Sequence, residues 1–142
     1  MIFKQLFEPV SSTYTYLVGC EQTGQAVLID PVVSVMERDL AVLSELGLKL
    51  AYTLDTHIHA DHITAALELK SKVGSKIAAP AFDRLPCTDH AIEEGRPFVL
   101  PTESRPHRAH HAALRARLHA RQCRHACGQC TGLQELPAIH HR

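Results

Sequence analysis

The chain has 142 residues, 45% of them hydrophobic, and its formal net charge is zero. This size and composition indicate one modest globular domain with a hydrophobic core of its own. No segment approaches the ~20 consecutive apolar residues of a membrane-spanning helix, and the N-terminus lacks a basic-then-apolar signal, so we expect a cytoplasmic protein without a membrane partner.

An antiparallel hairpin is predicted near the N-terminus, after a short segment of alternating apolar residues at 3–7. Residues 13–18 are rich in β-branched and aromatic side chains, as is typical of a strand. A turn at 21–24 leads to a buried strand at 26–29, which Asp30 and a proline close. Two strands joined by so short a turn pair antiparallel.

Two helices are predicted after the hairpin. Residues 35–46 repeat apolar side chains at helical spacing, with Ser34 as the candidate N-cap and Gly47 as the end. Residues 63–73 show the same spacing and end at Gly74. Strands are predicted at 48–54, 76–79 and 98–100, with a turn before the last. The order β-β-α-β-α-β indicates an α/β (α+β) fold with its site at a strand's carboxyl end.

The segment richest in potential metal ligands follows the predicted strand at 48–54. His57, His59, Asp61 and His62 form a His-x-His-x-Asp-His motif. In an extended loop alternate side chains share a face, so we expect His57, His59 and Asp61 to converge, while His62 starts the next element. Imidazoles and a carboxylate suit zinc, iron(II) or manganese. The motif therefore predicts a metal site.

This motif resembles the signature of the metallo-β-lactamase superfamily. Residues 7–16, Phe-Glu-Pro-Val-Ser-Ser-Thr-Tyr-Thr-Tyr, and residues 59–64, His-Ala-Asp-His-Ile-Thr, resemble its persulfide dioxygenase branch more than glyoxalase II. The resemblance covers about residues 1–100 and implies the N-terminal half of an αββα sandwich. It also implies O₂-dependent oxidation of glutathione persulfide to glutathione and sulfite with Fe²⁺, and allows a homodimer. Asp30 is either an ordinary turn residue or, as the resemblance implies, a support behind the metal loop.

The resemblance carries over residue by residue. His57 matches a metal ligand of the dioxygenase branch. His59, Asp61 and His62 match ligands of the dinuclear hydrolases, whereas in the mononuclear dioxygenase branch the resemblance implies that they support the ligands or face the substrate. Asp61 is also the candidate catalytic residue. The dioxygenase branch takes its other two ligands from later Pro-Gly-His-Thr and Thr-Gly-Asp segments, which these 142 residues lack. Three functions therefore stay open: a weakly active or inactive dioxygenase-like enzyme, a Zn²⁺-dependent glyoxalase II-like thioester hydrolase, and a non-catalytic remnant.

Residues 101–142 differ in composition from the rest. They carry seven Arg and Lys against two Asp and Glu, whereas residues 1–100 carry eight against thirteen. They also contain seven of the eleven His and no Lys, Asp, Phe, Tyr or Val. We therefore expect domain-like packing over 1–100 and a poorly packed tail over 101–142. Aromatic stacking residues are missing from this tail, so we expect no nucleic-acid partner.

Two further interpretations of the tail remain. Cys123, Cys127 and Cys130 have the spacing of a radical-SAM iron–sulfur motif, and His119 and His125 would permit a zinc site instead. Alternatively, the tail is the product of a shifted reading frame. Residues 103–108 have a possible coding sequence that gives Ser-Pro-Gly-His-Thr when it is read one base later, which includes one of the two missing segments.

Overall fold

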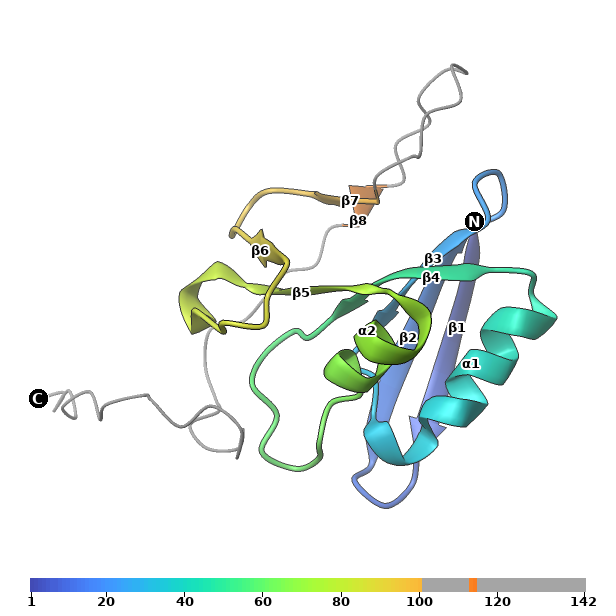
Figure 1. The fold of residues 1–142 in the computed structure, drawn as a ribbon, viewed down its shortest axis with the longest axis horizontal. Coiled ribbons are helices and arrows are strands. Elements are labelled where there is room, and N and C mark those ends of the chain that lie inside the picture. The colour runs from blue at the N-terminus through green and yellow to red at the C-terminus, as the bar shows by residue number, and fades with distance from the viewer. Residues whose placement is uncertain (101–112, 115–142) are drawn as a thin grey trace, which may run out of the picture.

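The computed structural model describes residues 1–100 and 113–114. A six-stranded mixed sheet, with strand order β1-β2-β3-β4-β5-β6, forms its centre (Figure 1). The strands are β1 (Ile2–Glu8), β2 (Thr13–Cys20), β3 (Gln25–Ile29), β4 (Lys49–Leu54), β5 (Lys76–Pro80) and β6 (His90–Ile92). A separate two-stranded ribbon consists of β7 (Phe98–Val99) and β8 (Ala113–Leu114).

The N-terminal half of the sheet is antiparallel and the other half is parallel. β2 pairs antiparallel with both β1 and β3, which confirms the predicted hairpin. β4, β5 and β6 continue the sheet in parallel from β3. The carboxyl ends of these parallel strands meet at one edge, where the loop after β4 begins. Strand β6 was not predicted, because its three residues carry too short a pattern to recognise.

Both helices begin later than the sequence predicted. α1 spans Met36–Glu45 behind a 3₁₀ turn, η1 (Val33–Val35), so Ser34 lies inside that turn and the predicted Ser34 N-cap is wrong. α2 spans Ala66–Val73, not 63–73, and the side chain of Ile63 is 71% exposed. The carbonyl of Ile63 accepts a bond from the N–H of Val33 instead of a helical one. Pairing with the segment after β3 therefore holds this stretch out of the helix.

The helices end as predicted. The N–H of Gly74 bonds to the carbonyl of Lys70, and Gly74 adopts a positive φ of 73°. Glycine takes up this left-handed conformation without the steric cost of a Cβ. Gly47 follows the end of α1 with a φ of 65° in the same way.

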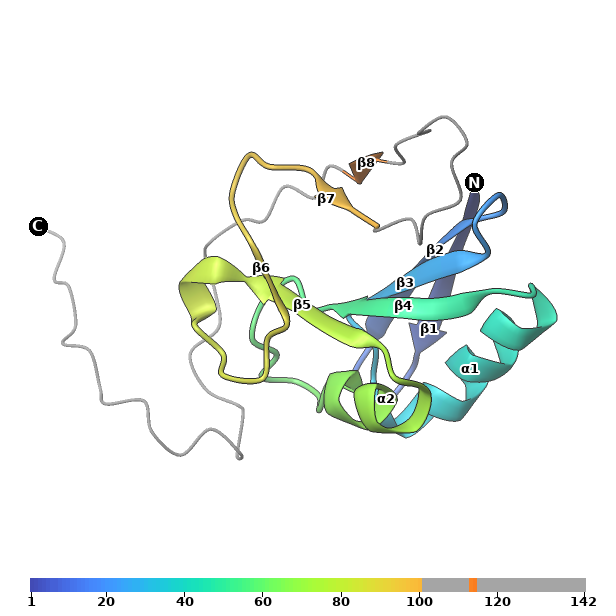
Figure 2. The ribbon, with the colours of Figure 1, turned by 45° about the horizontal axis from the view of Figure 1, so that its top comes forward.

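The two faces of the sheet carry separate hydrophobic clusters. One cluster lies between the sheet and both helices and includes Leu17, Leu28, Leu43 and Leu69. The other lies on the opposite face, toward β7, and is formed by Val18, Val27, Tyr52, Leu54, Ala78, Ile92 and Phe98. Figure 2 shows the helices below the sheet and the β7–β8 ribbon above it. β3 and β4 are thus buried on both sides, which explains their nearly continuous apolar sequences.

The predictions for the tail fall on residues that the structure does not describe. In the range 101–142 it describes only β8, so the predicted poor packing and the candidate ligands Cys123, Cys127 and Cys130 lie outside the described residues.

Among the described helices, none has the length and apolar character needed to cross a membrane.

Candidate metal centre

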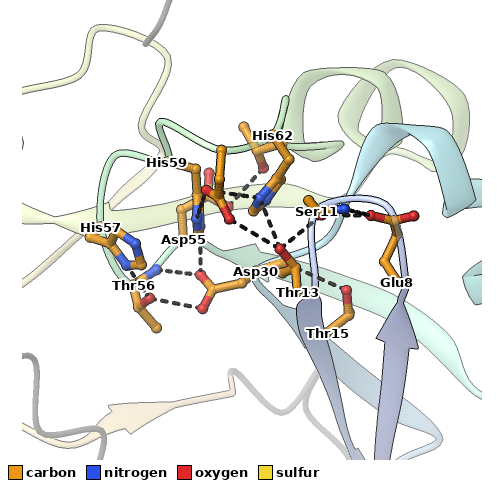
Figure 3. Close-up of polar contacts among 12 residues, drawn as sticks. Glu8, Ser11, Thr13, Thr15, Asp30, Asp55, Thr56, His57, His59 and His62 are labelled. Carbon is orange, nitrogen blue, oxygen red and sulfur yellow. Dashed lines mark hydrogen bonds and ion pairs between the residues drawn. The ribbon is translucent and has the colours of Figure 1, made fainter. Parts of the chain in front are cut away.

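The candidate site is the loop that joins β4 to α2. It lies at the carboxyl edge of the parallel strands, between the end of β3 and the β1–β2 turn (Figure 3). Its first residue is fixed by a backbone bond from the N–H of Asp55 to the carbonyl of Ala78 in β5. Its far end is fixed by bonds from Val33 to Ile63 and from Ala65 to Pro31. The loop therefore leaves and returns to the sheet at defined points.

Three imidazole rings lie in a row in this loop. The ring centroids of His57 and His59 are 4.2 Å apart, and those of His59 and His62 are also 4.2 Å apart. His59 is the central ring and is buried. The expectation that His62 starts the next element is wrong, because α2 begins at Ala66 and His62 belongs to the loop. The loop is not an extended strand, so convergence is not limited to alternate residues.

The side chains form two overlapping groups of metal-ligand type. The ligand atoms of Asp30, His57 and His59 lie within 4.8 Å of one another, and so do those of His59, Asp61 and His62. The four residues that the sequence singled out are thus divided between two groups that share His59, and Asp30 is added to the group of His57. The expected convergence of His57, His59 and Asp61 in one group is not found, because His57 and Asp61 lie in different groups.

Asp30 supports the loop from behind. It follows β3 with a φ of 51°, a conformation uncommon outside glycine, and its carbonyl accepts a bond from the Thr15 hydroxyl at 2.9 Å. Its carboxylate accepts bonds from the N–H and hydroxyl of Thr56, at 2.7 and 2.8 Å, and lies 3.0 Å from Nε2 of His59. Of the two alternatives for Asp30, this geometry agrees with the supporting role.

Asp55, the first residue of the loop, carries a buried carboxyl group. Its Oδ1 accepts a bond from the Thr64 hydroxyl at 2.8 Å. Burial raises the pKa of Asp55 to about 6, although the Thr64 hydrogen bond and the nearby His59 oppose the rise. The neutral form is therefore favoured more strongly here than in water.

The electrostatic balance differs among the other groups. Burial lowers the pKa of His59, but the neighbouring carboxylates, Asp30 foremost, outweigh burial and hold that pKa above its usual value. Burial and the charge of His59 lower the pKa of His62. For Asp61, burial acts to raise the pKa, but hydrogen bonds from its own backbone and from His62 leave it lowered. The cluster therefore concentrates negative charge around the central ring, a setting that favours a cation.

One atom of the cluster tests whether its residues fit a metal ion. Nε2 of His62 is buried and has no hydrogen-bond partner within the described part of the chain. Buried polar atoms are nearly always paired, so an unpaired imidazole nitrogen beside a carboxylate and another imidazole needs an explanation. Nitrogen and carboxylate ligands at such spacing fit zinc or iron.

Several residues of the site were not found from the sequence. Thr56 and Asp55 adjoin the motif, but nothing in their sequence context distinguishes a support from an ordinary loop residue. Thr13, the first residue of β2, contacts the motif from a distant part of the sequence, with its hydroxyl 3.2 Å from Nδ1 of His62. The only available signal was its place in the segment at 7–16 that resembles the dioxygenase branch.

The mixed sheet, the two helices on one face and the His/Asp loop at its edge define an α/β protein with a candidate metal centre. The chain belongs to the metallo-beta-lactamase superfamily, because the model of that family matches residues 9–118. The fold class expected from the sequence is thereby confirmed.

Individual relatives narrow the resemblance. Over 112 residues the chain is 42% identical to the mitochondrial persulfide dioxygenase ETHE1 of Mus musculus. The aligned segment covers 75% of this chain and 44% of the mouse protein. The chain is 40% identical over 88 residues to a hydroxyacylglutathione hydrolase of Rhodospirillum rubrum, covering 61% of this chain and 34% of that protein. The crystal structure of ETHE1 from Myxococcus xanthus matches with a TM-score of 0.66 and 45% identity, over 69% of this chain and 43% of that one. The chain thus spans less than half the length of these relatives.

Proposed function

We propose that this chain is a metallo-β-lactamase-fold metalloprotein of the persulfide dioxygenase type, with glutathione persulfide as its substrate. The observation that carries the proposal is the row of three imidazoles on the loop after β4, with the carboxylates of Asp30 and Asp61 beside them. The identity to mammalian and bacterial persulfide dioxygenases supports the choice of branch. The cytoplasmic location expected from the sequence remains a prediction, as does a homodimer.

His57, His59, Asp61 and His62 are the residues that would hold the ion, and Asp30 would orient His59. A bound Fe²⁺ would supply O₂ and sulfur chemistry, whereas Zn²⁺ would supply an activated water. The protein's own part is to fix the rings at the sheet edge and to bury their polar atoms. Outer groups that orient metal ligands often matter nearly as much as the ligands themselves.

The activity of these 142 residues alone should be weak. A facial triad of two histidines and one carboxylate leaves open positions for substrate and O₂. The later Pro-Gly-His-Thr and Thr-Gly-Asp segments of the dioxygenase branch are missing from this sequence. We therefore propose loose metal binding and little turnover, and a non-catalytic role remains an alternative.

A specific observation supports a second candidate, a thioester hydrolase of the glyoxalase II type. The group formed by His59, Asp61 and His62 overlaps the group of Asp30, His57 and His59, with His59 in both. A dinuclear zinc site places its ions within a few ångströms of each other, as two such neighbouring ligand groups would allow, and a hydroxyacylglutathione hydrolase is among the relatives. Asp61, which is exposed at its carboxylate edge, would then be the catalytic candidate.

Metal binding tests the site directly. Equilibrium dialysis of the full chain against Fe²⁺, under anaerobic conditions, or against Zn²⁺ should detect an ion whose binding His57→Ala abolishes. His90→Ala is the matched control, because His90 lies outside the loop and packs against Tyr52 and Phe98. Equal binding by wild type and His57→Ala would contradict the proposed site. Tightly held iron that is lost only on changing Cys123, Cys127 and Cys130 would instead support a cluster in the tail.

Activity separates the two candidate functions. Oxygen uptake should be measured with glutathione persulfide and added Fe²⁺, and thioester hydrolysis with added Zn²⁺. We expect little oxygen uptake by this chain, and any that occurs should depend on His57. Robust oxygen consumption would contradict the weak activity, while thioester hydrolysis without oxygen uptake would favour the hydrolase.

A further inference from the structure

A row of hydrogen bonds links the β1–β2 turn to His62. It starts at Glu8, the last residue of β1, whose side chain is buried. The Glu8 carboxylate accepts bonds from the N–H groups of Val10 and Ser11, at 3.0 and 2.7 Å, and from the Ser11 hydroxyl at 2.5 Å. The Ser11 hydroxyl, followed by the two backbone N–H groups, lowers the pKa of Glu8. Glu8 is therefore an ionised group that only accepts hydrogen bonds.

The row continues through two hydroxyls to the candidate metal centre (Figure 3). Oγ of Ser11 lies 2.9 Å from Oγ1 of Thr13, and Oγ1 of Thr13 lies 3.2 Å from Nδ1 of His62. Asp61 flanks this end of the row, with Oδ2 3.3 Å from Thr13 and Oδ1 3.3 Å from Nδ1 of His62.

The number of protons available determines which atom donates and which accepts at each contact of the row. A hydroxyl has one proton to donate, and the Ser11 proton is committed to Glu8 by the shortest contact. The contact between Ser11 and Thr13 then needs the Thr13 proton, for which Asp61 and Nδ1 of His62 are the other acceptors within reach. Donation to Nδ1 would leave the 2.9 Å contact between the Ser11 and Thr13 oxygens without a proton, whereas donation to Ser11 pairs every contact of the row and turns the Thr13 oxygen toward His62 as an acceptor. Because Asp61 is also an acceptor, both neighbours of Nδ1 require the proton to lie on Nδ1.

We propose that Glu8, Ser11 and Thr13 are positioning residues that hold His62 in the tautomer with its proton on Nδ1. The lone pair of Nε2 then faces the candidate metal centre. This agrees with the buried Nε2 atom that has no partner in the described part of the chain. The opposite tautomer would bury an unpaired N–H at Nε2. It would also leave Nδ1 without a proton to share with the Asp61 carboxylate or the Thr13 oxygen.

The inference rests on the proposed function only where it takes Nε2 of His62 as a metal ligand. The tautomer itself can be measured in the full metal-free chain. Long-range ¹H–¹⁵N correlation spectra, recorded at about pH 8 so that histidines are mostly neutral, distinguish the two ring nitrogens. A His62→Gln variant identifies the signal of His62 among the eleven histidines. Wild-type His62 should carry its proton on Nδ1.

Thr13→Val tests the row, because it keeps the shape of Thr13 and removes the accepting oxygen. We expect a mixture of tautomers at His62 and Zn²⁺ binding weaker by about 10- to 100-fold, the usual cost of losing an outer partner of a metal ligand. Thr13→Ser should restore both. Thr23→Val is the matched control, because Thr23 is exposed in the β2–β3 turn, where its hydroxyl accepts a bond from the N–H of Gln25 and makes no contact with the row.

The outcomes separate this inference from the proposed function. A wild-type His62 protonated on Nε2 overturns the inference, and this result does not depend on how any Thr13 variant folds. A folded Thr13→Val that keeps the Nδ1 proton throughout also overturns it, because Asp61 alone would then set the tautomer. Metal binding that is insensitive to His57→Ala, together with an Nδ1 proton that Thr13→Val disturbs, would reject the metal site and leave the row intact.

Discussion

Two buried carboxyl groups at the ends of strands, Glu8 and Asp55, behave differently because their hydrogen-bond partners differ. Glu8 receives two backbone N–H groups and one hydroxyl, and its pKa is lowered. Asp55 receives one hydroxyl, and burial raises its pKa to about 6. Hydrogen bonds to the charged form compensate for lost water at Glu8 and do not at Asp55. The number of donors therefore decides which carboxylate is tolerated in its ionised form.

This difference predicts a pH-dependent stability from Asp55. Because its pKa is higher in the folded state than in the unfolded chain, folding favours the proton, and stability falls as pH rises from the ordinary carboxyl pKa to about 6. Relative to Asp55→Asn, the metal-free wild type should lose on the order of 3 kcal/mol at most between about pH 4 and pH 7. Urea unfolding across this range measures the difference. Parallel pH curves for the two proteins would contradict it.

At the scale of elements, Asp89, the residue directly before β6, bonds to two neighbouring residues in β5 and α2. Its carboxylate accepts a bond from the N–H of Ile77 in β5 at 2.8 Å and lies 2.6 Å from Nζ of Lys70 in α2. The N–H of Asp89 also bonds to the carbonyl of Ile77. These contacts hold the short edge strand β6 beside β5. The Lys70 hydrogen bond and the Ile77 N–H together lower the pKa of Asp89.

Asp89→Asn should therefore destabilise the fold at neutral pH by about 1 kcal/mol, a value reduced because both charged groups are partly exposed. A lowered carboxyl pKa gives stability that is present above the ordinary value and is lost as pH falls through the folded one. The difference between wild type and variant should thus vanish in acid. Glu93→Gln is the control, since it breaks an exposed pair with Arg96 and should have almost no effect. Chemical denaturation of both variants at two pH values decides the point.

At the scale of the whole molecule, different elements cover the two faces of the sheet. Helices α1 and α2 cover one face, and the segment around Phe98 covers part of the other. Phe98 is 4% exposed and meets Tyr52 edge to face, with ring centroids 5.2 Å apart. Its neighbour Val99, on the opposite side of β7, is 40% exposed. Cover on the second face therefore depends strongly on one aromatic side chain.

Phe98→Ala should cost about 3 kcal/mol or more of unfolding free energy, because it opens a cavity against Tyr52. Val99→Ala, one residue away, should cost less than about 1 kcal/mol, because its side chain is already partly in water. Thermal and urea unfolding of the two variants give the comparison. Similar losses for both would show that β7 does not close this face.

Short-range patterns were sufficient for much of the fold. The strands β2, β3 and β4 follow from runs of β-branched and apolar residues, and the helix ends follow from Gly47 and Gly74. The His-x-His-x-Asp-His motif located the candidate site because its residues are adjacent in the chain. These features depend on local backbone preference and burial, which a single sequence expresses directly.

Long-range contacts decided the rest. The late start of α2 depends on a bond between Val33 and Ile63, and the supporting role of Asp30 depends on Thr56, 26 residues away. Thr13 meets His62 across 49 residues. Hydroxyl and carboxylate side chains are common in turns, and their sequence does not say which partner they will meet. The sequence alone therefore determined the family's motif and the strands that carry it, while the tertiary structure decided which polar groups orient the rings, because hydrogen bonds depend on distances that only the folded chain creates.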